Sequence, residues 1–536
     1  MTATIIYYIV SPVHVRNAKL LSVHLPDWNF HLVYESISPW LNERTLSTSG
    51  FPSTGFNTDG LPDSIWEKNI DAVIFSTLQP RGGPLALLEG ALQRNIATIA
   101  IEESNQIALN RGSVNNYILP VDKVLTASDS ERMGMVQAGF PAARFAVTGW
   151  PFYGGSIGRV AAEEKAESKK SIGLDPLRPV AALTLTGLHD AGESPVVRER
   201  QLSLAAQGLP SEYQLVIKPH PIESLQSLMP FVDKCAPRAR VLEGSVRVEE
   251  LLKASDVLLN RGVSQVCIEA LFQGVPVIVL ETGIRTPFHG LVDSLIVHSP
   301  EQMPEALDAV VGNDRSLQSY EPFYKEHVPY TPEEARAKTC AVIAEVAGAG
   351  RRENGRGGQW FDMALYWGWV GQRRKAVAAV GQTPVGESDC PRQELLRLLE
   401  YNAEHADFDR LLNYFGTGFR ADFLRGLWIS QLVSTSRKPG TRDLEILSDF
   451  PPDIQTVWFV PNVREWAMHL AQNGFSELAD NFVCEVCKRH VHVPGFSELE
   501  RDYTTYTSGI VGRSVVIWKS RVIRIVKTIR NTVYNR

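Results

Sequence analysis

Residues 255–280 read SDVLLNRGVSQVCIEALFQGVPVIVL, and the order of apolar and polar residues predicts a strand, a helix and a second strand. The apolar run VLL predicts a buried strand, and Gly262 lies in the loop that follows it. A helix is expected to begin near Ser264, which suits an N-cap, and to close at Gly274. The run VIVL then predicts the next strand. This order is typical of a parallel α/β sheet.

Apolar runs of the same kind recur along the first 350 residues. They are rich in Val and Ile and are separated by helix-length segments, as in buried parallel strands. Five of them stand at 4–10, 72–76, 98–101, 123–127 and 145–148. Five more stand at 180–185, 214–217, 240–242, 257–259 and 277–280. Because so many strands exceed one compact sheet, we expect two Rossmann-like domains, residues 1–158 and 172–350, that face each other across a cleft.

The character of the chain changes after residue 350. The polar, glycine-rich stretch RRENGRGG at 351–358 predicts a linker, and helical periodicity then predicts an all-α accessory domain over 359–510. We expect a protein partner for this domain. The last segment, 513–536, holds seven Lys and Arg and no acidic residue, with apolar residues at spacings of three and four. It predicts a basic amphipathic helix in peripheral contact with an anionic membrane, the alternative being a helix packed on the accessory domain.

Composition limits the class of protein. The 536 residues are 44% apolar and 21% charged, as in ordinary globular proteins, and the net charge of −6 argues against a dedicated nucleic-acid binder. The sequence has no run of about 18 apolar residues, and its apolar N-terminus lacks the features of a signal peptide, so it predicts a strand. Six scattered cysteines predict no disulfide framework. We therefore expect a cytoplasmic protein.

One group of residues has zinc-like spacing, namely Cys484, Cys487, His490 and His492. The cysteines fall near the end of a predicted amphipathic helix, where small buried cysteines are common. A second, separate ligand pair is missing from the sequence, so we predict no metal.

The start of the helix near Ser264 is a candidate phosphate site, because the first turn offers free N–H groups and a positive dipole. Glu269 lies five residues further on, about 7.5 Å along the axis at 1.5 Å per residue. That is about the distance from a diphosphate to its ribose, whose hydroxyls a carboxylate accepts. An ordinary helix with a satisfied glutamate is the alternative.

Two further segments follow strands of the second predicted domain, and ligands gather at the carboxyl ends of such strands. Lys218 and His220 belong to the sequence KPHP, in which two prolines fix the backbone around the imidazole. His220 is therefore a candidate donor to phosphate or a sugar hydroxyl. Thr186 and Gly187 are candidates for the same site, since a glycine lets backbone approach a phosphate.

The first predicted domain offers candidates for the acceptor side. Glu103 follows the strand at 98–101 and is the favoured general base. Gln79 and Arg81 follow the strand at 72–76, and His14 follows the first strand. We expect these three residues to contact an acceptor or a phosphate.

Together the sequences VTGWP at 147–151, IKPHP at 217–221 and the stretch at 255–280 resemble GT-B glycosyltransferases and the related UDP-N-acetylglucosamine 2-epimerases. Bacterial capsule and teichoic-acid transferases share similar HP-type signatures. The resemblance covers about residues 1–347. It implies that His220 contacts the nucleotide-sugar phosphates, that Ser264 binds phosphate and that Glu269 binds ribose. It implies no cofactor, since the nucleotide sugar is a co-substrate.

The sequence thus predicts a glycosyltransferase that moves a sugar from a nucleotide-sugar donor to a glycan, lipid-linked or protein acceptor, for surface glycan or protein glycosylation. A 2-epimerase is an alternative, although of the epimerase segment expected at 101–106 only Glu103 is present. The Gly-Asp-Thr segment expected near 77–79 has no aspartate. A non-catalytic scaffold with a degenerate transferase core is the third reading.

Overall fold

The structure is a computed structural model. It describes residues 3–349, apart from gaps at 37–40, 42–45, 58–60, 68, 78–81, 102–117, 138–139, 156, 187–194, 221–222, 244–245, 263, 283–285 and 312–315. Beyond them it describes residues 357–369, 373–383, 389–399 and 408–415, with scattered residues between 424 and 483. Glu103, Gln79, Arg81, Gly187, the Cys484–His492 group and the helix predicted at 513–536 lie outside the described residues.

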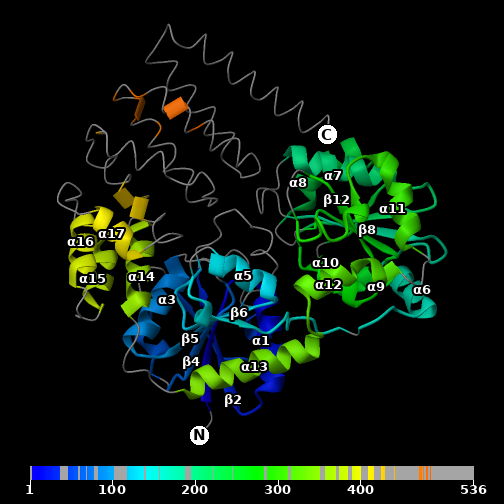
Figure 1. Cartoon of the computed structure of the whole chain (residues 1–536). Coiled ribbons are helices and arrows are strands. Elements are labelled where there is room, and N and C mark those ends of the chain that lie inside the picture. The colour runs from blue at the N-terminus through cyan, green and yellow to red at the C-terminus, as the bar shows by residue number, and fades with distance from the viewer. Residues whose placement is uncertain are drawn as a thin grey trace. The chain divides into compact units, whose positions relative to one another are not determined.

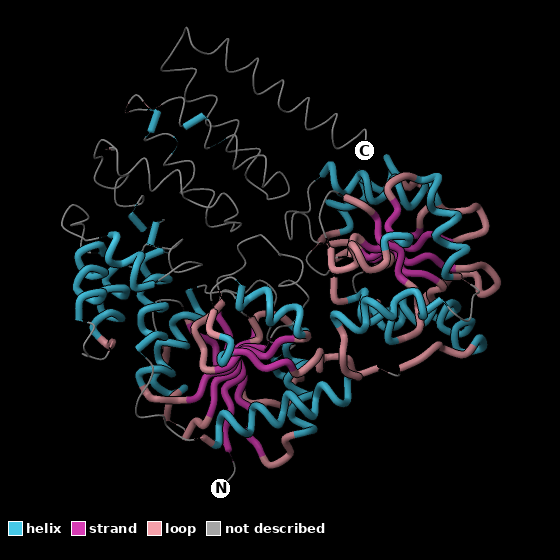
Figure 2. Tube along the Cα trace, in the orientation of Figure 1, coloured by secondary structure: helices cyan, strands magenta, loops and turns pink. Residues whose placement is uncertain are grey.

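Two parallel sheets form the framework of residues 3–349, shown in magenta in Figure 2. The first has the order β3-β2-β1-β4-β5-β6-β7. Its strands are β1 (Ala3–Ile9), β2 (Trp28–Glu35), β3 (Ser53–Phe56), β4 (Ala72–Phe75), β5 (Ala97–Ile101), β6 (Lys123–Thr126) and β7 (Phe145–Val147). The order reverses between β1 and β4, so the carboxyl ends of these two strands form the switch point where ligands bind in such sheets.

The second sheet has the order β10-β9-β8-β11-β12-β13, again with every recorded pairing parallel. Its strands are β8 (Val180–Thr184), β9 (Gln214–Lys218), β10 (Arg240–Val241), β11 (Val257–Asn260), β12 (Val277–Leu280) and β13 (Ile296–Val297). The central strands β8, β11 and β12 are buried at every position, which is why they are almost uninterrupted apolar runs. Both sheets thus have the Rossmann order, and the predicted pair of Rossmann-like domains is confirmed.

Helices cover both faces of each sheet (Figure 1). On the first sheet they are α1 (Pro12–His24), α3 (Gly82–Gln93), α5 (Asp129–Gln137) and α13 (Pro332–Gly348). On the second they are α6 (Ala162–Ser171), α7 (Pro195–Gly208), α8 (Leu225–Cys235), α9 (Val248–Ala254), α10 (Val266–Phe272), α11 (Met303–Val310) and α12 (Glu321–His327). Short 3₁₀ turns are η1 (Asp63–Ile65), η2 (Ala142–Arg144), η3 (Asp293–Leu295), η4 (Pro300–Gln302) and η5 (Ser316–Tyr320).

The segment after β7 connects the two sheets and packs on α10. Trp150 is 1% exposed and stacks on Phe272, with ring centroids 6.2 Å apart and an interplanar angle of 8°. Gly149 has φ +83°, and a Cβ there would lie 2.8 Å from the Cβ of Ala335 on α13. This explains why the VTGWP sequence needs both its glycine and its tryptophan.

α13 follows the second sheet in sequence but returns to the first. It contacts α1 and β5, and the Arg336 guanidinium donates to the carbonyls of Pro151 and Tyr153. The thiol of Cys340 donates to the carbonyl of Leu21 on α1. The first sheet is therefore completed by a helix from the far end of the α/β region.

Three strands were not predicted. β2 (WNFHLVYE) carries polar residues at alternate positions, and β3 and β13 are short strands at the edges of their sheets. Strands that are this short, or that carry polar residues at alternate positions, give a weaker hydrophobic signal. The sheets consequently have seven and six strands instead of five each.

The described part of the C-terminal unit consists of helices, in agreement with the predicted all-α character. They are α14 (Gly357–Trp369), α15 (Arg373–Gly381), α16 (Asp389–Leu399) and α17 (Phe408–Phe415). α14 is rich in buried aromatic residues such as Trp360, Tyr366 and Trp367. The Lys375 ammonium lies 4.4 Å from the centroid of the Trp367 ring.

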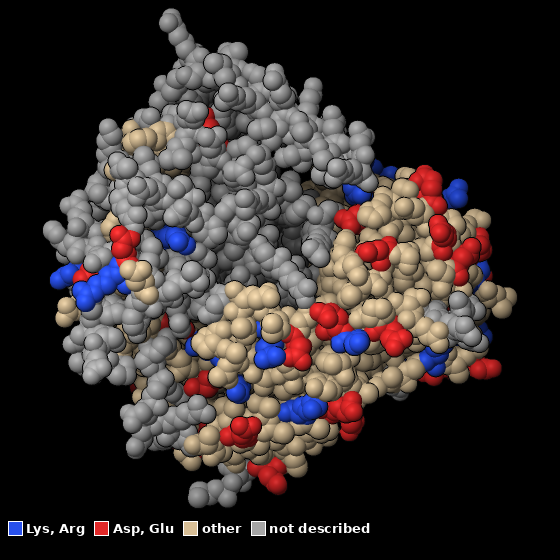
Figure 3. All heavy atoms as spheres, in the orientation of Figure 1, with Lys and Arg blue, Asp and Glu red and all other residues tan. Residues whose placement is uncertain are grey.

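Charge is mixed on the face shown in Figure 3, where Lys and Arg of the described residues are interspersed with Asp and Glu. Among the described residues, no helix combines the length and apolarity needed to cross a membrane.

Candidate functional site

The candidate site lies at the carboxyl edge of the second sheet. Thr184 at the end of β8 pairs with Lys218 at the end of β9, so both side chains stand at the same level of the sheet. Asn260 ends β11 on the other side of β8. Adjacent strands are about 4.8 Å apart, so the segments after β9 and β11 begin about 10 Å from each other. The structure therefore brings the KPHP sequence and the loop of Gly262 to one edge, with Thr186 between them.

Asn260 fixes the geometry of this edge. Its side-chain amide donates to the carbonyl and the hydroxyl of Thr184, at 3.1 and 2.8 Å, and its side-chain oxygen accepts from the backbone N–H of Gly262 at 2.8 Å. It is 1% exposed. The amide thus joins the end of β8 to the loop that leads into α10.

Gly262 occupies a position that only glycine fits. Its φ is +77°, and a Cβ there would lie 3.0 to 3.1 Å from the Thr286 side chain. The backbone of this loop consequently packs directly against the segment after β12. Its neighbour Arg261 is 1% exposed, which places a buried positive charge beside the predicted phosphate site.

The helix after this loop begins one residue later than a cap at Ser264 would place it. α10 starts at Val266, and its N-cap is Gln265, whose side chain makes no cap hydrogen bond. Ser264 stands one residue before this N-cap, and its hydroxyl accepts from the N–H of Val266 at 3.4 Å, as a capping side chain does. Gly274, with φ +71°, ends the helix as expected.

A buried ion pair connects the segments that carry Thr186 and His220. Arg198 on α7 donates to the Glu223 carboxylate at 2.6 Å and to the carbonyl of Thr186 at 2.6 Å. The side chains of Arg198 and Glu223 are 0% and 3% exposed. Glu223 in turn donates its backbone N–H to the carbonyl of His220 at 2.9 Å. Arg198 therefore holds the two loops in one arrangement.

Lys218 is almost fully buried at the end of β9, and burial lowers the pKa of its ammonium group. A buried cation at the edge of a sheet attracts an anion, because the low local dielectric strengthens the interaction. Lys218 and Arg261 are thus buried cations beside the loops that follow β9 and β11, in addition to Arg198, whose charge is paired with Glu223.

Glu269 is held by a residue of the first domain. Nη2 of Arg16 on α1 lies 3.2 Å from Oε1 of Glu269, and Nη1 lies 2.8 Å from Oε1 of Glu249 on α9. Burial raises the pKa of Glu269 to about 7, against the lowering effect of the Arg16 guanidinium, and the Glu249 carboxylate adds to the rise. The carboxylate predicted to accept ribose hydroxyls thus bonds to Arg16 in this structure.

A second chain of polar side chains follows β12. His289 Nδ1 accepts from the N–H of Thr286 at 2.9 Å, so the proton of a neutral ring is on Nε2. Nε2 lies 2.9 Å from Oε2 of Glu281, the first residue after the strand. Thr286 also packs against Gly262. The Glu281–His289–Thr286 hydrogen bonds therefore support the loop before α10 from the segment after β12.

In the first domain His14 lies at the switch point of the sheet. Its Nδ1 accepts from the N–H of Val10 at 2.9 Å and lies 2.8 Å from the Ser76 hydroxyl. The ring is 3% exposed. His14 therefore connects the end of β1 to the end of β4. Arg16, which pairs with Glu269 of α10, follows two residues later on the same helix.

Sequence reasoning missed Arg16, Arg198, Arg261, Asn260 and the Glu281–His289 pair. Asn260 and Glu281 were open to prediction, because both stand where an apolar strand ends, as Lys218 does. Arg16 and Arg198 lie on helices, and their partners are 233 and 25 residues away in sequence, so no local pattern identifies them.

No protein-family model and no curated protein matches this sequence. Solved structures are similar in fold. The MnaA–UDP complex of S. aureus has 13% identity and a TM-score of 0.46, over 66% of this chain and 99% of that one. A UDP-GlcNAc 2-epimerase from Neisseria meningitidis, bound to UDP-GlcNAc, has 12% identity and a TM-score of 0.43, over 64% and 100%.

The wall teichoic acid polymerase TagF has 10% identity and a TM-score of 0.42, over 65% of this chain and 89% of that one. At these levels of similarity the three structures carry no inference on the chemistry of this chain. Its own two Rossmann-ordered sheets give it the two-domain fold expected from the resemblance to the GT-B superfamily. Among the described residues, no group of three or more His, Cys, Asp and Glu is placed to hold a metal ion.

Proposed function

We propose that this chain is a GT-B glycosyltransferase that moves a sugar from a nucleotide-sugar donor to an acceptor hydroxyl. The observation that carries the proposal is the carboxyl edge of the second sheet. There His220, Thr186 and the Gly262 loop are held together, with the buried cations Lys218 and Arg261 beside them. An edge of this composition suits a nucleoside diphosphate.

In the proposed reaction the bond from the anomeric carbon to the phosphate oxygen breaks, and a bond to the acceptor oxygen forms. The acceptor proton passes to a general base, for which Glu103 remains the candidate from the sequence. The departing diphosphate carries the negative charge. His220, Lys218 and the N–H groups at the start of α10 stabilise it by hydrogen bonds and charge.

Glu269 is the proposed partner of the ribose hydroxyls. Arg16 contacts Oε1 alone, so ribose hydroxyls that bind this carboxylate share it with the guanidinium. The acceptor is a glycan, a lipid-linked sugar or a protein, and surface glycan or protein glycosylation is the proposed setting. A peripheral membrane contact through 513–536 would suit a lipid-linked acceptor.

The test is a thermal-shift and calorimetric panel of UDP-, GDP-, CMP- and CDP-sugars on the full chain, followed by nucleotide release with and without acceptors. We expect one class of nucleotide sugar to bind and acceptor to accelerate nucleotide release. Production of UDP and N-acetylmannosamine from UDP-N-acetylglucosamine alone would indicate a 2-epimerase instead. Failure of every nucleotide sugar to bind would contradict the proposed function and favour a non-catalytic scaffold with a degenerate transferase core.

The variant His220→Ala tests the proposed role of the imidazole. We expect turnover to fall at least about a hundredfold with unchanged thermal stability, as for loss of a charge-stabilising group. The matched control is His298→Ala, since His298 is exposed and also follows a strand, β13. Turnover retained by His220→Ala would remove this residue from the mechanism.

A further inference from the structure

A pocket of about 660 Å³ opens at the opposite edge of the second sheet from the candidate active site. Much of its lining comes from segments that precede the strands: Arg178 before β8, residues 209–211 and 213 before β9, and residues 236–239 before β10. The candidate active site lies where the same strands end. Since a five-residue strand spans about 16 Å, the two places are separated by the length of the strands.

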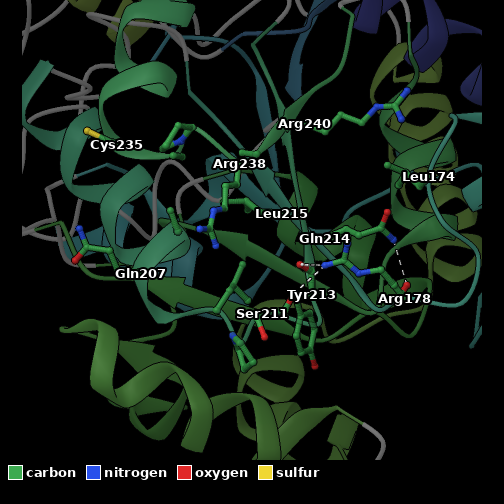
Figure 4. A pocket seen from close by; sticks show the side chains of 16 residues that line it. Leu174, Arg178, Gln207, Ser211, Tyr213, Gln214, Leu215, Cys235, Arg238 and Arg240 are labelled. Carbon is green, nitrogen blue, oxygen red and sulfur yellow. Dashed lines mark hydrogen bonds between the residues drawn. The ribbon is translucent and has the colours of Figure 1, made fainter.

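Three arginines are among the residues that line the pocket (Figure 4). Among the described residues that line it, Arg178, Arg238 and Arg240 are cationic and none is Asp or Glu. Helices α7 and α8 end at the pocket, and each helix C-terminus contributes about half a negative charge. The three guanidinium groups outweigh these partial charges, whereas the carboxylates of Glu212, Asp256 and Asp308 act on Tyr213.

Arg178 is fixed before any ligand arrives. It donates to the carbonyls of Ser211, Glu212 and Tyr213, at 2.9, 3.1 and 3.2 Å. These acceptors are neutral, so the bonds orient the guanidinium without cancelling its charge. Arg240 donates to the carbonyl of Gly173 in the same way, whereas the side chain of Arg238 is exposed at the pocket.

The rest of the lining is apolar or neutral. Leu174, Leu209, Leu215 and Pro237 supply an apolar wall, and Tyr213 and Gln207 supply a ring and an amide. A volume of 660 Å³ lies within the range of small-molecule sites, about 300 to 1,000 Å³. The occupant that fits is thus an organic molecule with a compact anionic group.

We propose that this pocket binds a phosphorylated small molecule at a site separate from the nucleotide-sugar site. A phosphate monoester carries a charge of about −1.5 to −2 at pH 7 and three strong acceptor oxygens, so it suits an arginine-lined pocket better than a single carboxylate does. The guanidinium of Arg238 makes the charge-assisted contact with the phosphate, and the apolar wall receives the organic part. The proposal is independent of the glycosyltransferase assignment, because it rests on the opposite edge of the sheet.

Isothermal titration calorimetry with glucose 6-phosphate on the full chain tests this site, with glucose as the uncharged control. We expect saturable binding of glucose 6-phosphate, no binding of glucose, and the same affinity in the presence of saturating UDP. The variant Arg238→Gln should weaken binding about tenfold or more, the effect of losing one charge-assisted hydrogen bond. The control Arg132→Gln, which removes an arginine of α5 paired with Asp129, should bind as the wild type does.

Three results would overturn the proposal: no saturable binding of glucose 6-phosphate, equal binding by Arg238→Gln and the wild type, or loss of binding when UDP is added. The last would assign the ligand to the nucleotide site. Arg238 is exposed, so its substitution should leave the melting temperature unchanged. Failure of nucleotide sugars to bind would reject the proposed function without affecting this result.

Discussion

Arg16 and Glu269 form an ion pair between the two Rossmann-like domains, with Nη2 of the arginine 3.2 Å from Oε1 of the glutamate. The glutamate side chain is 5% exposed and the arginine side chain 37% exposed. The same guanidinium also binds Glu249, so one cation serves two carboxylates. The contact joins α1, which starts at the switch point of the first sheet, to α10 at the edge of the second.

Arg16→Ala should lower the free energy of unfolding by about 1 to 3 kcal/mol, as expected for charge-assisted hydrogen bonds. The loss should be larger at pH 8 than at pH 6. Without Arg16 the pKa of Glu269 rises further, so the carboxyl is protonated in both proteins at pH 6 and the variant loses little there. At pH 8 the wild type ionises Glu269 beside Arg16, whereas the variant lacks this stabilisation of the charged form. Urea unfolding at both pH values measures this.

Lys19→Ala is the matched control, since it removes one positive charge from an exposed position of the same helix. Its effect should be small at both pH values. An Arg16→Ala effect that is equal at pH 6 and pH 8 would contradict the coupling between Arg16 and Glu269.

Glu269→Gln should remove a pH dependence of stability. In the folded protein the pKa of Glu269 is raised to about 7 from 4.5, so the folded state holds this proton more tightly than the unfolded state does. Its contribution to stability therefore falls as the pH rises from 4.5 to 7, by about 1.4 kcal/mol per unit. The difference in unfolding free energy, variant minus wild type, should rise across this window.

Denaturant unfolding between pH 4.5 and 8 measures that difference. Glu305→Gln on α11 is the control, since Glu305 is exposed and its substitution should produce a flat difference. A flat difference for Glu269→Gln as well would mean that the folded carboxyl titrates normally.

The Arg198–Glu223 pair allows positioning to be separated from stability. Arg198→Met alone leaves a buried carboxylate without this partner and should cost about 3 to 5 kcal/mol. The double variant Arg198→Met, Glu223→Leu removes both charges and should recover most of that stability. It still lacks the hydrogen bond from Arg198 to the carbonyl of Thr186, so nucleotide-sugar affinity should remain at least about tenfold weaker.

Thermal melting and calorimetry with the nucleotide sugar found in the panel distinguish the two effects. Wild-type affinity in a stable double variant would show that Arg198 contributes to folding alone.

Gly262→Ala should weaken nucleotide binding more than it weakens the fold. The new Cβ would lie 3.0 to 3.1 Å from Thr286 at a backbone φ of +77°, so the loop before α10 must shift. Gly290→Ala is the control: its φ is +80°, but a Cβ there has no neighbour within 4 Å. Both should lose about 1 to 2 kcal/mol from backbone strain, and Gly262→Ala alone should lose nucleotide binding.

Comparison of melting temperatures and calorimetric affinities for the two alanine variants checks this prediction. Equal affinities in both would mean that the Gly262 loop does not shape the nucleotide site.

The sequence alone determined the strands that lie inside the sheets and the loops that follow them. A central parallel strand is apolar on both faces, so β8, β11 and β12 are visible as uninterrupted runs, and the Gly262 loop necessarily follows β11. The run QLVI likewise identifies β9, whose carboxyl end carries Lys218 and His220. The short strands β3 and β13 were harder to predict because two to four residues give a weak periodicity signal, and β2 was harder because polar residues interrupt its apolar ones.

Only the tertiary structure decided which side chains meet. Arg16 and Glu269 are 253 residues apart, and Lys165 and Lys169 approach Asp256 from α6, about 90 residues away. Burial alone would raise the pKa of Asp256, but the two lysines and the N–H of Val180 hold it below its usual value. Hydrophobic periodicity reports the buried face of each element, whereas an ion pair depends on how elements from distant parts of the chain are packed, and no local pattern encodes that.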